Sequence, residues 1–126
     1  MEYRRLKLED LISKAGESKQ NAYLDVYIKR LDSTIKVKKP NNGLILESID
    51  LIKEDAHESD LHLVYNSIVE PNIKDSTLHD TYNVSRPVEI LDKIFTLGEI
   101  AGISKILVGS AGYEESAVKL VEDIKN

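Results

Sequence analysis

The stretch HESDLH, residues 57–62, is the closest approach to a metal-binding motif in this sequence. The zinc-protease motif HExxH places two histidines four residues apart, so that both imidazoles share one face of a helix. His57 and His62 are five residues apart, and on a helix their side chains diverge by about 140°. Glu58 and Asp60 could add ligands for adventitious metal. We expect solvated surface histidines and no resident metal.

A second candidate for chemistry is the segment Gly109-Ser110-Ala111-Gly112, which follows an apolar run. A dinucleotide-binding loop needs G-x-G-x-x-G and a phosphate loop needs G-x-x-x-x-G-K-[ST], and neither pattern is present. A nucleophile elbow needs a glycine two residues before its serine, where this chain has Val108. We therefore predict that Gly109 and Gly112 end a helix. The sequence predicts no catalytic residue and no cofactor.

The elements that carry these residues follow from the spacing of apolar positions. Leu8, Leu11 and Ile12 share one face of a short helix near the N-terminus. Strict alternation then predicts a β-hairpin over about residues 22–38, with its turn at Asp32-Ser33. Two strands alone are only marginally stable, so helices must cover the apolar side of this hairpin.

Aromatic residues are few, with six Tyr, one Phe and no Trp, and the core must therefore be aliphatic. Tyr23 and Tyr27 share the outward side of the first predicted strand. They form either an aromatic contact patch or ordinary cross-strand packing, and the pattern leaves both open.

Beyond residue 40 the apolar positions recur every three or four residues, which predicts a helical body. Asn41 or Asn42 is expected to cap its first helix, and Ser59 the next, which Pro71 closes. Ser85 is expected to cap a later helix that carries Pro87 in its first turn. A short helix is expected over residues 76–82, and a last one over residues 114–125.

The strongest local signal is Thr96-Leu97-Gly98-Glu99, which matches a capping box. It predicts a helix from Leu97 to Gly109 with Ile100, Ile103, Ile106 and Leu107 on one side. The fold class is therefore predicted as α+β, mainly α, with five to six helices after the hairpin. We expect a single domain over residues 1–126, made of an N-terminal helix and loop (1–21), the hairpin (22–39) and a helical body (41–126).

Charge is distributed unevenly along the 126 residues. Residues 1–39 hold ten Lys/Arg against six Asp/Glu, or +4, whereas residues 40–126 hold seven against sixteen, or −9. An acidic body argues against binding nucleic acid. The absence of cysteine excludes disulfides and thiolate chemistry, and no apolar run is long enough to span a membrane. These features predict a cytoplasmic protein without a membrane partner.

The order of elements, together with KDSTLHDTY (74–82) and the run PVEILDKIFTLGEIAGISKILVGSAGY (87–113), resembles the XkdN-like family of phage tail assembly chaperones. That family comes from contractile-tailed phages and phage-derived tail particles. The resemblance implies a non-enzymatic protein that binds the tape-measure protein in the host cytoplasm and keeps it soluble while the tail tube assembles. The tail tube protein is a further candidate partner, and homo-oligomerisation stays open.

A chaperone for helical segments needs an apolar surface that accepts side chains at helical spacing. We predict that Ile100, Ile103, Leu107 and Val121 border this surface, with the alternative that they fill the domain's own core. A different function is also open: another small acidic interaction module, such as an antitoxin, immunity or adaptor protein.

Overall fold

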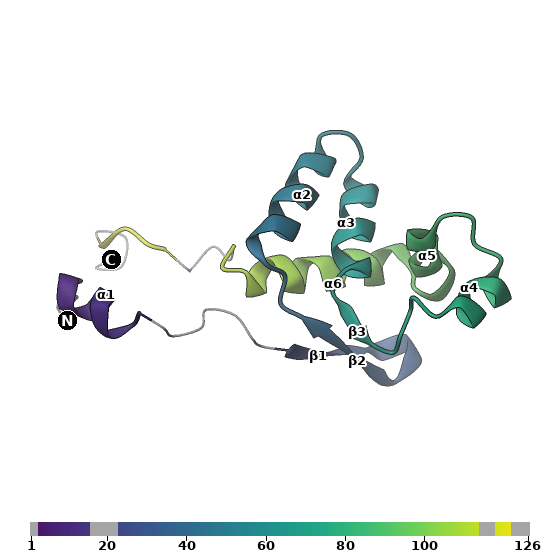
Figure 1. Ribbon diagram of the computed structural model, residues 1–126, viewed down its shortest axis with the longest axis horizontal. Helices are drawn as coiled ribbons and strands as arrows, with labels where there is room; N and C mark the ends of the chain where they lie inside the picture. The colour runs from purple at the N-terminus through teal and green to yellow at the C-terminus, as the bar shows by residue number, and fades with distance from the viewer. Residues whose placement is uncertain (1–2, 16–22, 114–117, 122–126) are drawn as a thin grey trace.

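The computed structural model describes residues 3–15, 23–113 and 118–121. These residues form six α-helices, two short 3₁₀ helices and a three-stranded antiparallel sheet, which confirms the predicted α+β, mainly α, class. Figure 1 shows helices α2, α3 and α6 above the sheet. In chain order the elements are α1 (Leu8–Ser13), β1 (Tyr23–Ile28), η1 (Lys29–Leu31), β2 (Ser33–Lys38), α2 (Asn42–Ile52), α3 (Ala56–Tyr65), β3 (Ile68–Glu70), α4 (Ser76–Tyr82), η2 (Pro87–Glu89), α5 (Ile90–Ile94) and α6 (Leu97–Ser110).

The predicted hairpin is present as β1 and β2, whose register pairs Val26 with Ile35. Both of these side chains are buried, while alternate positions of the strands face outward, as the period of two requires. The connection is longer than the expected two-residue turn. The 3₁₀ helix η1 fills it, and Asp32 takes a left-handed φ of 46° before β2 begins.

A third strand replaces the end of a predicted helix. The expected helix ran through Ile68 to Pro71, but α3 ends at Tyr65 and β3 follows. Two features explain this correction. The β-branched pair Ile68-Val69 favours a strand, and Pro71 disfavours helix in the residue before it. The backbone N–H of Lys38 also donates to the Ser67 carbonyl at 2.8 Å, which continues the contact between β2 and β3.

Helices α2 and α3 form a hairpin whose caps were predicted only in part. Asn41 caps α2 as expected, accepting from the Leu44 N–H at 2.8 Å. Asp55, not Ser59, caps α3. Ser59 lies one turn inside α3, where its buried hydroxyl donates to the Ser48 carbonyl of α2 at 2.6 Å. The serine therefore joins two helices instead of starting one.

The predicted helix after Ser85 is also divided differently. Arg86 precedes the 3₁₀ helix η2, in which Pro87 occupies the first position, and α5 continues directly from it. Phe95 then adopts an extended conformation, with φ −121° and ψ 154°, which separates α5 from α6. The short helix over residues 76–82 is confirmed as α4.

Helix α6 follows the predicted capping box closely. The Glu99 N–H donates to Thr96 Oγ1 at 3.1 Å, and the Thr96 N–H donates to Glu99 Oε1 at 2.9 Å. The helix continues through Gly109 to Ser110, and Gly112 takes a φ of 94° just beyond it. The glycine segment is thus a helix end, as predicted, with Gly112 supplying the left-handed residue.

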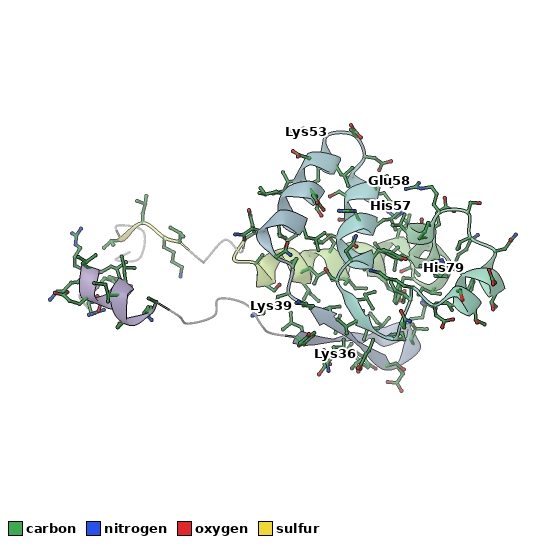
Figure 2. All side chains as sticks on the ribbon, viewed as in Figure 1. Lys36, Lys39, Lys53, His57, Glu58 and His79 are labelled. Atoms are coloured by element: carbon green, nitrogen blue, oxygen red, sulfur yellow. The ribbon has the colours of Figure 1, made fainter. Side chains whose placement is uncertain are left out.

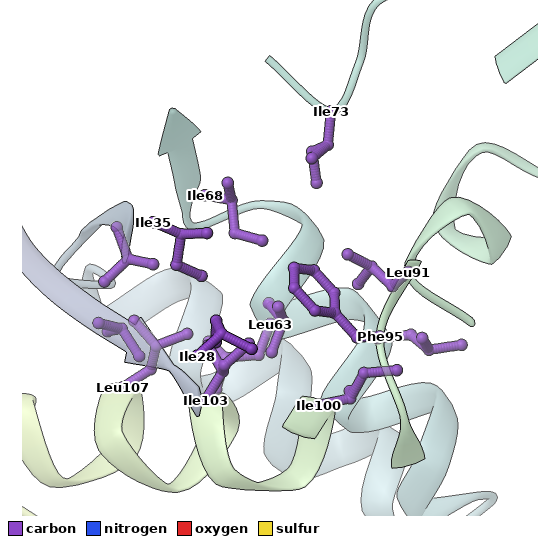
Figure 3. Packing of buried hydrophobic residues seen from close by; sticks show 14 of the residues in the cluster. Ile28, Ile35, Leu63, Ile68, Ile73, Leu91, Phe95, Ile100, Ile103 and Leu107 are labelled. Carbon is purple, nitrogen blue, oxygen red and sulfur yellow. The ribbon is translucent and has the colours of Figure 1, made fainter. Parts of the chain in front are cut away.

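The core lies between the sheet and the helices and is almost entirely aliphatic. Figure 3 shows the side chains of Ile28 and Ile35 from the hairpin and those of Ile103 and Leu107 from α6 within one packed cluster. Phe95 is the one aromatic side chain among the buried hydrophobic residues that the structure describes. The buried hydrophobic residues are Val26, Ile28, Ile35, Val37, Ile45, Leu61, Leu63, Val64, Ile68, Ile73, Ile90, Leu91, Phe95, Ile100, Ile103 and Leu107.

The two ends of the chain contribute nothing to this core within the described ranges. Helix α1 forms as predicted, but none of its residues is buried, and Leu8, Leu11 and Ile12 are exposed. Most of the helix predicted over residues 114–125 lies outside the described residues, and residues 118–120 within it are not helical. No helix in the part of the chain that the structure describes is long and apolar enough to cross a membrane.

Candidate binding surface

The histidines of the HESDLH stretch face different partners. His57 Nε2 lies 2.8 Å from Asp92 Oδ1 of α5, whereas His62 Nε2 lies 2.8 Å from Glu47 Oε2 of α2. The two imidazoles therefore join α3 to different neighbours and do not converge. Within the described ranges, no three His, Asp or Glu side chains come close enough together to hold a metal ion.

The remaining polar groups near these histidines also make structural contacts. Glu58 binds Arg86 through both carboxylate oxygens, at 2.7 and 3.0 Å, and these hydrogen bonds lower the pKa of Glu58. His79 lies apart on α4, with Nε2 2.7 Å from the Ile73 carbonyl oxygen. Figure 2 shows His57 and Glu58 on α3 and His79 beside α4. The hydroxyl of Ser110, which lies in the glycine segment, donates to the Leu107 carbonyl at 2.7 Å.

Three of the four residues predicted to border a partner surface lie in the core. Ile100, Ile103 and Leu107 are at most 2% exposed, because the face of α6 that carries them packs against α3 and the sheet. Val121 is 46% exposed. The four residues therefore do not form one surface in the folded chain, and the three isoleucine and leucine side chains hold α6 in place.

An apolar hollow opens instead between α2, α3 and the C-terminal end of α6. We call it the α2 cleft, and its volume is about 160 Å³. Ile49 and Ile52 of α2 and Tyr113 beyond α6 form exposed parts of its wall, above the buried Ile45 and Leu63. The full lining is Ile45, Ser48, Ile49, Ile52, Ser59, Asp60, Leu63, Ser104, Val108 and Tyr113.

Two serine hydroxyls that line the α2 cleft are already hydrogen-bonded to the protein. The Ser48 hydroxyl donates to the Leu44 carbonyl at 3.0 Å, and the Ser59 hydroxyl donates to the Ser48 carbonyl. Among the described residues, no buried side-chain nitrogen or oxygen lacks a partner. Asp60 is the charged residue of the lining. The isoleucine, leucine and valine side chains of the lining make this hollow suitable for an aliphatic side chain.

A second hollow lies on the other flank of α6, beside β1. We call it the edge groove; its volume is about 220 Å³. Its apolar wall combines strand residues with the exposed Gly102 and Ile106 of α6. The full lining is Val26, Tyr27, Ile28, Lys29, Glu99, Gly102, Ile103 and Ile106.

An ion pair fixes the hairpin against the start of α6 at this groove. Arg30 donates to both oxygens of Glu99, at 2.9 and 3.0 Å, and to the Ile94 carbonyl at 2.8 Å. The hydrogen bonds from Arg30, followed by that from the Thr96 N–H, lower the pKa of Glu99 from 4.5 to about 2. The Glu99 carboxylate therefore takes part both in the capping box and in the ion pair with Arg30 of the hairpin connection.

The outward tyrosines of β1 are exposed but have contacts within the hairpin. Lys36 Nζ lies 5.5 Å from the Tyr23 ring centre, and Tyr27 Oη donates to Asp32 Oδ1 at 2.6 Å. That hydrogen bond raises the pKa of Tyr27. Contacts within the hairpin therefore hold part of each tyrosine side chain, and the remaining area of each faces solvent.

One known protein family matches most of this chain. A family model described as the phage XkdN-like tail assembly chaperone protein matches residues 25–125, from within β1 to near the end of the chain. The chain belongs to this family. The resemblance inferred from residues 74–82 and 87–113 is thereby confirmed. Comparison with curated proteins and with solved structures found no significant match.

Because the chain belongs to a tail assembly chaperone family, its apolar hollows are candidate surfaces for binding protein. The sequence pattern predicted neither of the two hollows. Ile49 and Ile52 lie one turn apart on α2, and the structure places both at the wall of the cleft. Ile52 is the last residue of α2 and is 55% exposed. Nothing in the local pattern predicts the edge groove, because its two walls are about seventy residues apart in the chain.

Proposed function

We propose that this chain binds helical segments of a phage tape-measure protein and keeps them soluble while the tail tube assembles. Membership of the tail assembly chaperone family supports this function. The α2 cleft is the structural observation that carries it, because its open wall of Ile49, Ile52 and Tyr113 can accept an aliphatic side chain. Binding of this kind exchanges solvent-exposed apolar surface on the client for contacts in the cleft.

The chemistry of the cleft specifies the kind of helix that would bind. An amphipathic client helix presents aliphatic residues at i, i+3, i+4 and i+7, and one of these enters the hollow. Asp60 lies in the lining, and residues 40–126 carry a net charge of −9. A client helix whose aliphatic stripe is flanked by Lys or Arg is therefore favoured over an acidic one.

The proposed role is non-catalytic. The side chains that most resemble catalytic groups are engaged in structural contacts: Ser110 with a backbone carbonyl, His57 with Asp92 and His62 with Glu47. None of these groups lies in the α2 cleft. The proposed activity therefore depends on apolar surface and on charge, without a chemical step.

Co-expression with the tape-measure protein of the same phage tests the function. We expect the tape-measure protein to move from the insoluble to the soluble fraction and to elute with this chain in size-exclusion chromatography. If it is equally insoluble with and without this chain, and no complex elutes, the chaperone function is wrong. The alternative of another acidic interaction module then becomes the better explanation.

A matched pair of variants on α2 tests the cleft separately from the function. Ile52→Gln removes an apolar wall residue that is 55% exposed, and Leu46→Gln makes the same change at a residue that is 59% exposed and outside the lining. Both positions are exposed, so neither change should unfold the chain, which circular dichroism would check. We expect Ile52→Gln to reduce recovery of soluble complex and Leu46→Gln to leave it unchanged.

The remaining outcomes assign the binding surface elsewhere without removing the function. Equal recovery with both variants would place the client outside the α2 cleft. Val121→Gln belongs in the same series, because Val121 is the exposed member of the four residues predicted from sequence. A loss confined to Val121→Gln would move the contact from the cleft to the C-terminal segment.

A further inference from the structure

The two edges of the sheet differ in how they are protected from pairing with another chain. Strand β3 is only three residues long and ends at Glu70, directly before Pro71. Short length, a charge and a following proline are common devices that stop edge-to-edge pairing. Strand β1 is six residues long, contains neither proline nor glycine, and pairs only with β2 among the described strands. Its inward positions, Leu24, Val26 and Ile28, are all apolar.

We propose that β1 is the pairing edge for a second copy of this chain. The two β1 strands run antiparallel about a two-fold axis at Val26 and join two three-stranded sheets into one. The inference concerns self-association only and does not depend on the proposed chaperone function. An isologous contact of this kind is the commonest arrangement in homodimers.

The sequence of β1 selects one register for this pairing. A shift of one residue would place inward side chains opposite outward ones, so only alternate registers keep the apolar face continuous. Two such registers pair five residues of each six-residue strand. The first places Asp25 opposite Asp25 of the second copy, which like charges disfavour.

The other register has no such conflict. It places Val26 opposite Val26 and Leu24 opposite Ile28 on the core side. On the outer side it places Asp25 opposite the uncharged Tyr27, so no two like charges face each other. Every residue of the strand segment 24–28 thus faces a compatible partner, which is the self-complementarity that a two-fold contact requires.

The edge groove gives the pairing a second contact layer. A two-fold axis perpendicular to the joined sheet keeps both α6 helices on the same side of it. The exposed Gly102 and Ile106 line the groove beside β1, so this side of α6 is directed toward the joint. A Cβ added at Gly98 or Gly102 would meet nothing within 4 Å, which leaves room for close approach of the second copy. Pairing would cover the apolar area that Ile106 now exposes.

Sedimentation equilibrium of the full chain over a wide concentration range tests the proposal. We expect a reversible monomer–dimer equilibrium. Tyr27→Asp should raise the dissociation constant by about tenfold or more, because it places two carboxylates opposite each other at two symmetric positions. The matched control is Tyr23→Asp. Tyr23 and Tyr27 lie on the same outer face and are 53% and 58% exposed. Tyr23, however, lies outside the paired segment 24–28.

A rescue variant separates the pairing from an effect on the hairpin itself. In Asp25→Lys/Tyr27→Asp, each lysine faces an aspartate of the second copy, and the dissociation constant should return to within a few-fold of the original. A strictly monomeric chain at all concentrations would overturn the proposal. So would a dimer that is weakened equally by Tyr23→Asp and Tyr27→Asp, or one that the double variant does not restore.

Discussion

The α2 cleft and the edge groove flank the same helix, but they suit different partners. The α2 cleft is walled by helices, and its exposed side chains, Ile49 and Ile52, stand one turn apart on α2. The edge groove has β1 as one wall, and among the described strands β1 pairs on one side only, with β2. The first therefore favours a side chain from a helix, and the second favours another strand.

Helix α6 has two separate structural roles. Its inner residues, Ile100, Ile103 and Leu107, anchor it between the helices and the sheet. Its flanks then contribute Val108 to the α2 cleft and Ile106 to the edge groove. Changes to the anchor should affect both surfaces together, whereas changes on a flank should affect one.

The largest effect is expected from Leu107→Ala, which removes an anchor shared by both surfaces. Leu107 is fully buried, and truncation of such a residue lowers the free energy of unfolding by about 2–5 kcal/mol. Urea denaturation would measure it, with the exposed Leu46→Ala as the control, for which less than about 0.5 kcal/mol is expected. A loss below about 1 kcal/mol would contradict the assignment of Leu107 to the core.

The next effect separates the two flanks. Ile52→Gln should weaken client binding by about fivefold to tenfold and leave self-association unchanged. The exposed half of the Ile52 side chain would no longer contribute apolar area to the contact with the client. Ile106→Gln should do the reverse. Client titration and sedimentation equilibrium on both variants would give the four values needed. Equal effects of either variant on both measurements would show that the two surfaces are not independent.

A smaller effect is expected from Thr96→Ala, which opens the capping box at the start of α6. Loss of the hydrogen bond from the Glu99 N–H should lower the free energy of unfolding by about 1 kcal/mol. Thr81→Ala is the control, because the Thr81 hydroxyl is exposed and only bonds a carbonyl within α4. Thermal unfolding of the two variants measures the difference, and an equal change in both would remove the special role of Thr96.

The smallest effect concerns acid, and Glu99 carries it. Its pKa is lowered from 4.5 to about 2 in the folded chain, so its ionised form stabilises the fold above pH 4.5, and this contribution is lost as the pH falls through 2. Glu99→Gln should therefore unfold at a lower temperature than the natural chain at pH 7. The gap between the two melting temperatures should shrink from pH 4.5 downward and close near pH 2. A gap that is constant over this range would contradict the ion pair with Arg30.

Local patterns were sufficient for several elements. Strict alternation predicted the hairpin, and the Thr96–Glu99 box predicted the start of α6 to the residue. Asn41 was one of two predicted caps and is the one used. In each case the determining contacts lie within a few residues of each other, so the sequence contains them directly.

The errors have a common physical cause. Ile68 fits the spacing of the preceding helix, but its segment pairs with β2, more than thirty residues earlier in the chain. Ser59 resembles a helix cap, but its hydroxyl bonds the Ser48 carbonyl on the neighbouring helix. Both outcomes depend on which distant segment lies alongside, and local propensity does not determine that.

The sequence by itself determined the aliphatic core, the mainly helical class and the family, because apolar spacing, caps and short motifs are local properties. Only the tertiary structure decided which apolar residues stay exposed. Ile100 and Ile106 share the same helical pattern, yet one is fully buried and the other is 44% exposed. The difference arises because α3 and the sheet cover one side of α6 and leave its flanks open. Burial is a property of the assembled neighbours, and a residue's own position in a pattern does not contain it.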